Sequence, residues 1–266
     1  MWSKHPQSPL PNGERVGRGA DVAGRTRRSN RRLPLSPAAA LLLALAACTP
    51  AAPDAPKKQQ DHEFPAAHRP VSPIVSNSFS TEEERDKVRE ADEVMTRAGV
   101  IAGMTVADIG AGEGYYTVRL ADRVGARGRV LAQDIIPATR DKLAERVSRE
   151  ALDNVSVKLG EPADPKLPDN SFDRIFLMHM YHEITQPYEF LWRLRPALRA
   201  GGRVVVVDMD RPTSEHGTPP ALLDCEFAAV GYARAYREAM PKAGGYLAMY
   251  EARGARPEPE AIRACK

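Results

Sequence analysis

The amino-acid sequence predicts an α/β fold: a mostly parallel sheet with helices on both faces, closed by an antiparallel β-hairpin. Short runs rich in Val, Ile and Leu alternate with helical segments between residues 105 and 208, as expected for strands that are buried on both faces. The first of these runs leads into a turn with glycine at alternate positions, and two later strand-like runs flank a Gly-containing turn at 241–245. The 266 residues provide for one such domain and a tail.

The expected elements follow one another with short connections. Thr81 and Glu84 form a capping-box pattern, which predicts the start of a helix that ends at Gly99. Gly201 and Gly202 predict a turn before the most apolar strand. We expect strands at 105–109, 129–133, 155–159, 174–179, 203–208, 232–236 and 246–251, and further helices at 115–124, 138–151, 187–198 and 220–229.

The turn after the first strand is the most informative segment. It reads Asp108-x-Gly110-x-Gly112-x-Gly114, and a helix begins directly after it. Glycine has no Cβ, so a ligand can lie against the backbone there, and the free N–H groups of the helix N-terminus suit a carboxylate or a phosphate. In the dinucleotide-binding pattern the third glycine comes one residue later, where this chain has Tyr115. This spacing disfavours a nicotinamide-dependent oxidoreductase.

These residues resemble motif I of the class I S-adenosylmethionine (SAM) dependent methyltransferases, and the order of segments from about 103 to 252 is similar to that family as well. The resemblance implies a Rossmann-like, seven-stranded sheet whose last strands form the antiparallel hairpin, with SAM as cofactor. The alternative is a tight strand–helix turn that binds nothing.

The resemblance also implies cofactor contacts. Asp108 is expected near the amino group of SAM, where a carboxylate suits an ammonium. Asp134, which closes the second strand, stands where an acidic side chain meets a ribose diol in folds of this layout. The remaining expected contacts near these ends of the ligand are Gly110, Ala111, Gly112, Gly114, Tyr116, Ile135 and His179.

The adenine end departs from the family pattern. Glu161 stands in the acidic position after the third strand, but Pro162 follows it and has no N–H to donate to the ring. Asp164, two residues after Pro162, is the alternative acidic residue.

The segment after the fourth strand contains the candidate catalytic residues, His182 and Glu183, either of which can act as a general base. The alternative is that His182 only caps the next helix and His179 packs at the strand end. His179 and His182 have a metal-like interval, but no third ligand stands nearby in the sequence, so no metal site is predicted.

The N-terminal part predicts export. Arginines precede the apolar run 37–47, which ends at Cys48 and is similar to a bacterial lipoprotein signal, with Cys48 as the lipidated residue. We therefore expect residues 1–48 to be a signal region, with 1–26 a possible over-extended start, and the protein to be anchored to a membrane and face the periplasm. An ordinary signal peptide, or an unused signal in a cytoplasmic protein, is the alternative.

The remaining organisation follows from composition. Residues 49–79 are rich in proline and predict a disordered linker, 80–252 the methyltransferase domain, and 253–266 a tail. Cys225 and Cys265 can pair in an oxidising compartment. Arginines are concentrated in the first 32 residues, and no basic patch with interleaved aromatic residues remains elsewhere, which disfavours nucleic-acid binding.

The function expected from these observations is SAM-dependent methyl transfer to an unidentified acceptor, either a small molecule or one associated with the membrane. The alternative function is that of an exported lipoprotein whose degenerate methyltransferase fold binds another ligand. The sequence does not identify the acceptor or the oligomeric state.

Overall fold

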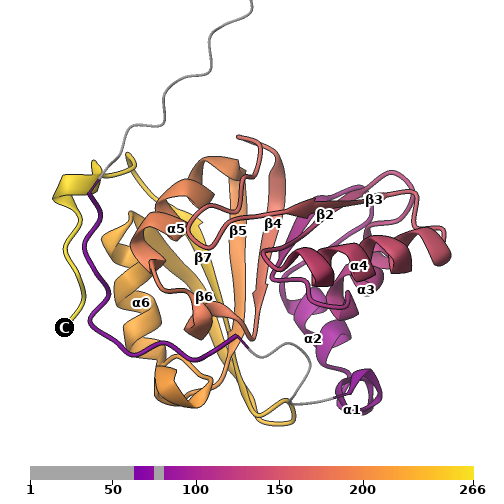
Figure 1. Ribbon diagram of the computed structural model, residues 1–266, viewed down its shortest axis with the longest axis horizontal. Coiled ribbons are helices and arrows are strands. Elements are labelled where there is room, and N and C mark those ends of the chain that lie inside the picture. The colour runs from indigo at the N-terminus through magenta and orange to yellow at the C-terminus, as the bar shows by residue number, and fades with distance from the viewer. Residues whose placement is uncertain (1–62, 75–80) are drawn as a thin grey trace, which may run out of the picture. The chain divides into compact units, whose positions relative to one another are not determined.

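The computed structural model describes residues 63–74 and 81–266. Its core is a seven-stranded sheet in the order β3-β2-β1-β4-β5-β7-β6 (Figure 1). Strands β1 to β5 are parallel, and β7 is antiparallel to both of its neighbours. The strands are β1 (Thr105–Ile109), β2 (Arg129–Asp134), β3 (Val155–Leu159), β4 (Phe172–Met178), β5 (Leu198–Asp208), β6 (Tyr232–Met240) and β7 (Gly245–Ala252). The predicted fold class and hairpin are confirmed.

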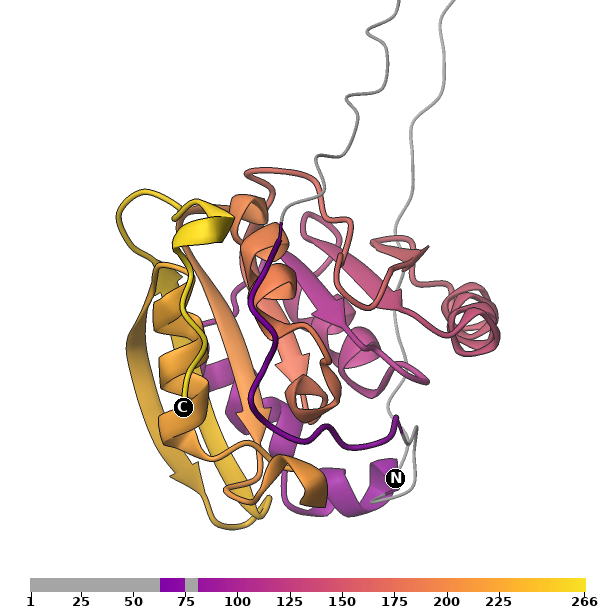
Figure 2. The same cartoon turned by 60° about the vertical axis from the view of Figure 1, so that its left-hand side comes forward.

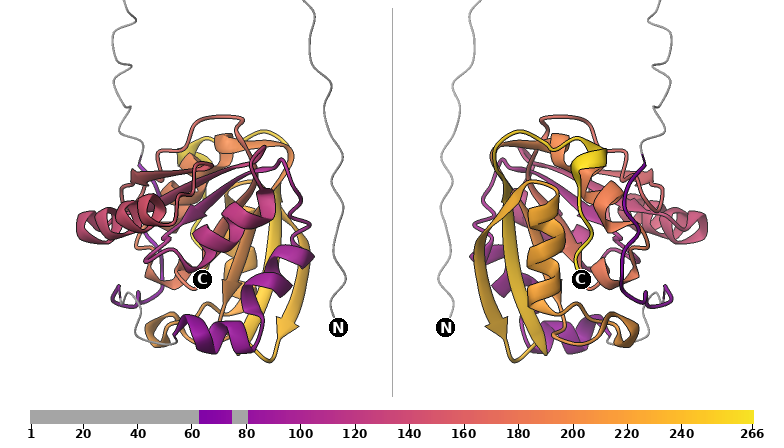
Figure 3. Two further views of the ribbon diagram at one scale, coloured as in Figure 1. Left: turned by 90° about the vertical axis from the view of Figure 1, so that its right-hand side faces the viewer. Right: turned by 90° about the vertical axis from the view of Figure 1, so that its left-hand side faces the viewer.

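Helices cover both faces of this sheet, as the turned views show (Figures 2 and 3). The described α-helices are α1 (Glu82–Lys87), α2 (Glu90–Arg97), α3 (Tyr115–Val124), α4 (Pro137–Arg149), α5 (Pro187–Leu194) and α6 (Pro220–Ala229). Four 3-10 turns accompany them: η1 (Tyr181–Glu183), η2 (Arg195–Ala197), η3 (Thr213–Glu215) and η4 (Pro259–Ala261). Among the described residues, no helix has the length and apolar character needed to cross a membrane.

The alternation of side chains in the strands divides the core into two hydrophobic layers. Val204 and Val206 of β5 pack with α5 and α6, whereas Val205 and Val207 pack with α2 and α3. All four valines are fully buried, because successive side chains of a strand point to opposite faces and both faces of this sheet are covered. This packing fixes the strand ends that carry the polar residues described below.

The helix predicted from the capping box to Gly99 is broken into α1 and α2. The capping box itself is present, with Glu84 N–H donating to Thr81 Oγ1 over 3.2 Å. Arg89 interrupts the helix with a left-handed backbone, φ 55°. The break lets α1 present Glu82 and Asp86 to arginines of α4 and α3 while α2 buries its first residue, Glu90.

The predicted turn at Gly201 and Gly202 is instead an irregularity within β5. Opposite β4, the pairing passes from Phe172–Leu198 directly to Arg174–Arg203, so the extra residues of β5 bulge between these two pairs. Gly201 has φ 75°, a left-handed conformation that glycine adopts without steric cost. The strand therefore begins earlier than its apolar run indicates.

The structure differs from the predicted linker over residues 63–74, which we call the N-terminal strap. The strap has no regular secondary structure but packs along the face that carries α5 and α6 (Figure 2). Phe64 lies edge-on to Trp192 of α5, with ring centroids 5.6 Å apart. Arg69 forms a buried ion pair with Glu226 of α6, Nε to Oε1 2.9 Å. These polar and aromatic anchors compensate for the sparse apolar content of the segment. Cys48 and the rest of the predicted signal lie outside the described residues.

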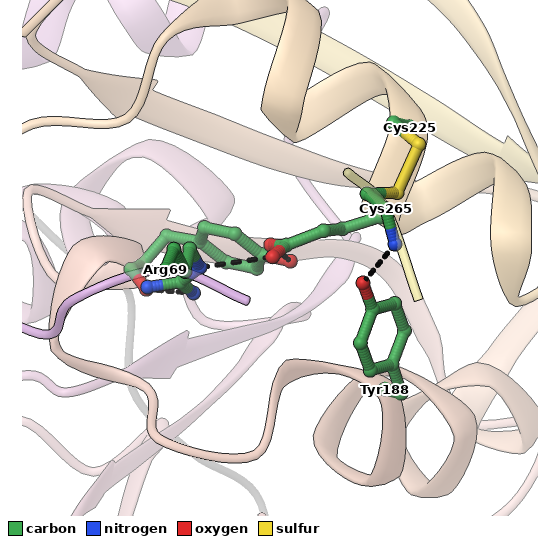
Figure 4. Close-up of a disulfide and its surroundings, with 6 residues drawn as sticks. Arg69, Tyr188, Cys225 and Cys265 are labelled. Atoms are coloured by element: carbon green, nitrogen blue, oxygen red, sulfur yellow. Dashed lines mark hydrogen bonds and ion pairs between the residues drawn. A yellow bond between two sulfur atoms is a disulfide. The ribbon is translucent and has the colours of Figure 1, made fainter. Parts of the chain in front are cut away.

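The C-terminal tail is fastened to the same face. Cys265 forms a disulfide with Cys225 of α6, with the Cα atoms 6.1 Å apart. The backbone N–H of Cys265 donates to Tyr188 Oη of α5 over 2.7 Å (Figure 4). The tail is thereby attached to α6, as the proposed pairing of these cysteines implied, and also to α5.

Removing this disulfide is expected to destabilise the domain. The crosslink closes a loop with a sequence separation of 40, and loss of such a constraint on the unfolded chain lowers the free energy of unfolding by about 3–4 kcal/mol. The variant with Cys225→Ser and Cys265→Ser should unfold at lower urea concentration than the oxidised parent and at the same concentration as the reduced parent. Equal midpoints for the oxidised parent and the variant would contradict this expectation.

Candidate functional site

The glycine turn between β1 and α3 adopts a backbone that side chains disfavour. Gly110, Gly112 and Gly114 have φ of 67°, 57° and 93°, in the left-handed region where glycine carries no steric penalty. A Cβ on Gly114 would lie 2.6 Å from Leu143 Cδ1, and one on Gly110 would lie 3.2 Å from Met180 Cγ. The left-handed backbone therefore favours glycine at these two positions, as the sequence pattern predicted, and a side chain there would also have to displace Leu143 or Met180.

Asp108 lies beneath this turn as a buried carboxylate. Only 2% of the residue is exposed, and Thr117 Oγ1 of α3 donates to it over 2.6 Å. Burial raises the pKa of Asp108 to about 6, although the hydrogen bond from Thr117 and the charge of Arg85 oppose that shift. Ionised Asp108 therefore lacks full compensation from the protein, which favours a cationic ligand group beside it.

Asp134 ends β2 and connects that strand to the glycine turn. Its Oδ2 accepts the Gly112 N–H over 3.0 Å, and its Oδ1 accepts the Ile136 N–H over 2.9 Å. A carboxylate oxygen can accept more than one hydrogen bond, so both oxygens retain capacity for ligand hydroxyls. Ile135 follows at the half-buried start of the next loop, and the N–H of Ala111 donates to the Gln133 carbonyl over 2.9 Å. The turn after β1 and the acid of β2 are thus one hydrogen-bonded unit.

A second polar cluster lies at the N-terminal helices and was not predicted. Glu90 of α2 is 4% exposed and accepts from Arg85 Nη2 (2.6 Å) and Tyr116 Oη (2.9 Å), with His179 Nε2 3.2 Å away. Burial alone would raise the pKa of Glu90, but His179 and Arg85 together hold it well below its usual range. The structure thus joins Tyr116 and His179, two expected cofactor contacts, through a shared carboxylate. The sequence feature that could have indicated this cluster is the position of Glu90 next to Ala91, on the apolar face of the predicted helix.

The expected adenine residues occupy one turn after β3. The backbones of Glu161 and Asp164 pair with each other, so the Asp164 N–H donates to the Glu161 carbonyl over 3.1 Å. The Glu161 carboxylate is exposed and forms an ion pair with Lys166. The Asp164 carboxylate accepts the Lys166 N–H over 2.8 Å. The role of Glu161 and Asp164 at the adenine remains a prediction.

His182 lies at the carboxyl edge beyond β4, on η1, and is 3% exposed. Its Nδ1 is 3.0 and 3.2 Å from the two carboxylate oxygens of Asp208, the last residue of β5. Asp208 also accepts from the Met209 N–H (2.8 Å) and Thr218 Oγ1 (2.7 Å). A carboxylate can only accept, which assigns the imidazole proton to Nδ1 and leaves Nε2 for chemistry. His182 does not cap α5, because the N-cap residue of that helix is Gln186, whose side chain forms no cap hydrogen bond.

The comparisons with known proteins agree with this geometry. Residues 106–202 match the family described as "Methyltransferase domain". The matched segment, which includes the glycine turn, Asp134 and His182, is thus similar to a methyltransferase domain. The chain is 33% identical over 121 residues to the ubiquinone/menaquinone biosynthesis C-methyltransferase UbiE of Idiomarina loihiensis, covering 44% of this chain and 47% of that protein. It is 28% identical over 135 residues to an arsenite methyltransferase of Halobacterium salinarum, covering 48% of this chain and 34% of that protein.

Solved structures show the same methyltransferase fold. A SAM-dependent methyltransferase from Aquifex aeolicus superposes with a TM-score of 0.57 at 25% identity, covering 63% of this chain and 90% of that one. The [4+2]-cyclase SpnF superposes with a TM-score of 0.56 at 18% identity, covering 71% and 89%, a likeness that concerns the fold alone. The chain spans about half the length of the curated UbiE relatives that it matches. SAM is the cofactor that the family implies, and the Asp108 carboxylate beside the glycine turn, which the protein compensates only in part, fits its ammonium group.

The substitution Asp108→Asn should separate stability from cofactor binding. Removing a buried charge that lacks compensation is expected to stabilise the unliganded domain at pH 7.5 by on the order of 1–3 kcal/mol, while weakening SAM binding by about tenfold to hundredfold through loss of the charged hydrogen bond. Urea denaturation and calorimetric titration measure the two effects. Asp122→Asn, at an exposed position of the same α3, is the matched control.

The raised pKa of Asp108 also sets the direction of the pH dependence. The folded-state pKa is about 6 against an ordinary value of 3.8, so the destabilisation caused by ionised Asp108 is fully present above pH 6 and is relieved as pH falls from 6 toward 3.8. SAM binding should weaken over the same interval, because protonated Asp108 no longer attracts an ammonium. Affinity that stays constant from pH 7.5 to 5, or an Asp108→Asn variant that binds SAM normally, would contradict the assignment.

Proposed function

We propose that this protein transfers a methyl group from SAM to a small-molecule acceptor. The supporting observation is the hydrogen-bonded unit at the carboxyl edge of the sheet, in which Gly112 joins the turn after β1 to Asp134 at the end of β2. Asp108 would hold the ammonium of SAM, Asp134 its ribose diol, and the glycine backbone would lie along it. Ligands of open α/β sheets bind at this edge.

The acceptor would lie toward the ends of β4 and β5. When bound, SAM supplies an electrophilic methyl group. The chain's part is alignment of the acceptor and control of its proton. His182 is suited to that part, because Asp208 fixes its ring and leaves Nε2 available to the acceptor. Glu183, half-buried on the same turn, is the second candidate base. One relative is named for C-methylation in ubiquinone/menaquinone biosynthesis and another for arsenite, which supports a small acceptor here.

The alternative is a ligand-binding module that no longer transfers methyl groups. Pro162 has no N–H for an adenine ring, and the N–H of Asp164, two residues further on, is already donated to the Glu161 carbonyl. The same fold also serves a protein named for a cyclisation. Cofactor binding decides between the two functions.

We further propose that the protein is exported and anchored through a lipid on Cys48. Disulfides form and persist in oxidising compartments, and the bond between Cys225 and Cys265 supports such a location. The apolar run before Cys48 is far shorter than a membrane span and fits a cleaved signal. If the signal is not used, the protein stays in the cytoplasm. In the exported case, an acceptor associated with the membrane would lie within reach.

Calorimetric titration of SAM, S-adenosylhomocysteine and NADH into the full chain tests the cofactor. We expect micromolar binding of the first two and none of NADH. Asp134→Asn should weaken SAM binding at least tenfold, because an amide oxygen cannot replace a carboxylate that serves two backbone N–H groups and a diol. Asp141→Asn, on the exposed part of α4, should bind SAM normally.

Thermal unfolding followed by circular dichroism would establish that each of these variants is folded. A folded parent that binds neither SAM nor S-adenosylhomocysteine would reject methyl transfer and favour the ligand-binding module.

Mass spectrometry of the peptide that contains Cys48 tests the anchor. After expression in a bacterium that processes lipoproteins, we expect Cys48 to be the first residue and to carry a diacylglycerol mass. The variant Cys48→Ser should leave the membrane fraction. A tryptic peptide that continues through Cys48 without added mass would contradict the anchor and favour the cytoplasmic location.

A further inference from the structure

Three side chains with metal-binding atoms meet beyond β4 and β5, although two of them are distant from the third in sequence. His182 and Glu183 lie on η1, and His216 follows η3. One ligand-type atom from each residue lies within 4.8 Å of those of the other two. Two imidazoles and one carboxylate form a donor set that suits zinc and related ions. We propose that His182, Glu183 and His216 bind a divalent transition-metal ion such as Zn²⁺.

The orientation of His182 supports this site. Its Nδ1 donates to Asp208, so Nε2 is the nitrogen left for an ion. Metal-binding histidines commonly donate their second ring N–H to a carboxylate, which fixes the tautomer and the ring. Asp208 is fully buried, and the Met209 N–H and Thr218 Oγ1 hold it in place. Asp208, held by Met209 and Thr218, therefore orients the His182 ring as a carboxylate does for a histidine that binds a metal.

The conformation of His216 brings its ring to His182. Its backbone is left-handed, with φ 57° and ψ 52°, which is uncommon for a residue other than glycine and persists where the surroundings require it. The ring lies edge-on to that of His182, with the centroids 5.4 Å apart. A chain that left η3 in ordinary extended geometry would direct this side chain elsewhere.

Ser72 of the N-terminal strap holds the two histidine loops together. Its N–H donates to the His182 carbonyl over 3.3 Å, and its Oγ accepts the His216 N–H over 3.0 Å. Ser72 is 3% exposed, so these bonds are shielded from water. One buried serine is thus fastened to the backbones of both histidines, which fixes the separation of η1 and η3.

The three residues differ in burial. His182 is buried, whereas Glu183 and His216 are half-buried, so the cluster lies near the surface of the domain. Three protein ligands leave at least one coordination position for water or for an oxygen of an organic ligand. If the methyl transfer proposed above holds, that position would bind an oxygen of the acceptor. The ion, rather than His182 or Glu183, would then control the proton of the acceptor, because the lone pairs of both residues would be bound to the metal. This role rests on the proposed function, whereas the metal site itself does not.

The sequence interval typical of a metal site is that between His179 and His182, but only His182 of these two belongs to the cluster. His179 lies against Glu90 of α2, and it is not one of the clustered ligands among the described residues. His216 takes its place from 34 positions beyond His182, after β5 and η3, and no local spacing indicates that meeting.

Metal binding to the full chain tests the proposal. The protein is stripped with EDTA, dialysed against Zn²⁺ or Co²⁺, and the bound metal is counted by elemental mass spectrometry. Visible absorption of the Co²⁺ form reports the coordination. We expect the parent to bind one ion at this site with micromolar or tighter affinity. Glu183→Gln and His216→Asn should each lower that affinity at least tenfold, and Asn tolerates the left-handed backbone of residue 216.

Two variants test positioning. Asp208→Asn should weaken Co²⁺ binding by about tenfold to hundredfold and alter its absorption spectrum, and Ser72→Ala should weaken it with the three ligands intact. His68→Ala removes an exposed histidine of the strap and should bind like the parent. A parent without Co²⁺ absorption, or a folded His216→Asn variant with the parental affinity and spectrum, would overturn the site.

Failure of the metal site and failure of methyl transfer remain distinguishable. Titration of SAM into the same samples should show that His216→Asn still binds SAM. Co²⁺ absorption should show that Asp134→Asn still binds the ion. An ion that binds through the three residues of a chain unable to bind SAM would uphold the metal site and reject the proposed function.

Discussion

Three buried carboxylates at the carboxyl edge of the sheet impose the constraint on which the site depends. Asp108, Asp134 and Asp208 lie at or next to the ends of β1, β2 and β5, each less than a tenth exposed. A buried charge is costly unless the protein or a ligand compensates for it. The three solutions differ. Asp134 is satisfied by backbone N–H groups, and Asp208 by an imidazole, a hydroxyl and an amide. Asp108 has the hydroxyl and backbone of Thr117 and the charge of Arg85, which do not offset its burial. The least compensated of them is the one assigned to a cationic ligand group.

The elements around this edge are predictable from the sequence where local patterns are strong. The limits of β1, α3 and β3 coincide with the predicted ranges, because short apolar runs bounded by turn residues leave few alternatives. The left-handed glycine turn and the position of Asp134 at the end of β2 were also predictable, since both follow from local sequence, whereas their contacts to SAM stay predictions. These features belong to single segments of chain.

Features that depend on distant partners were not predictable. The break at Arg89 allows Glu82 to reach Arg146, 64 positions away, and no helix propensity contains that information. The strap has the composition of a linker, yet Arg69 compensates Glu226, 157 positions further along the chain. His216 approaches His182 only because β5 and η3 intervene with a particular geometry. In each case a polar contact, rather than apolar periodicity, decides the local structure.

The ion pair between Arg69 and Glu226 also determines where the folded unit begins. Glu226 is 1% exposed and its second oxygen accepts from Tyr181 Oη over 2.8 Å, so the strap supplies the positive charge that this interior position requires. A chain shortened to the capping box at Thr81 would keep every helix and strand, yet it would contain an uncompensated buried carboxylate, at a cost of about 3–5 kcal/mol. The smallest stable domain therefore includes the strap, which precedes the first helix. A segment with the composition of a linker thus forms part of the buried interior.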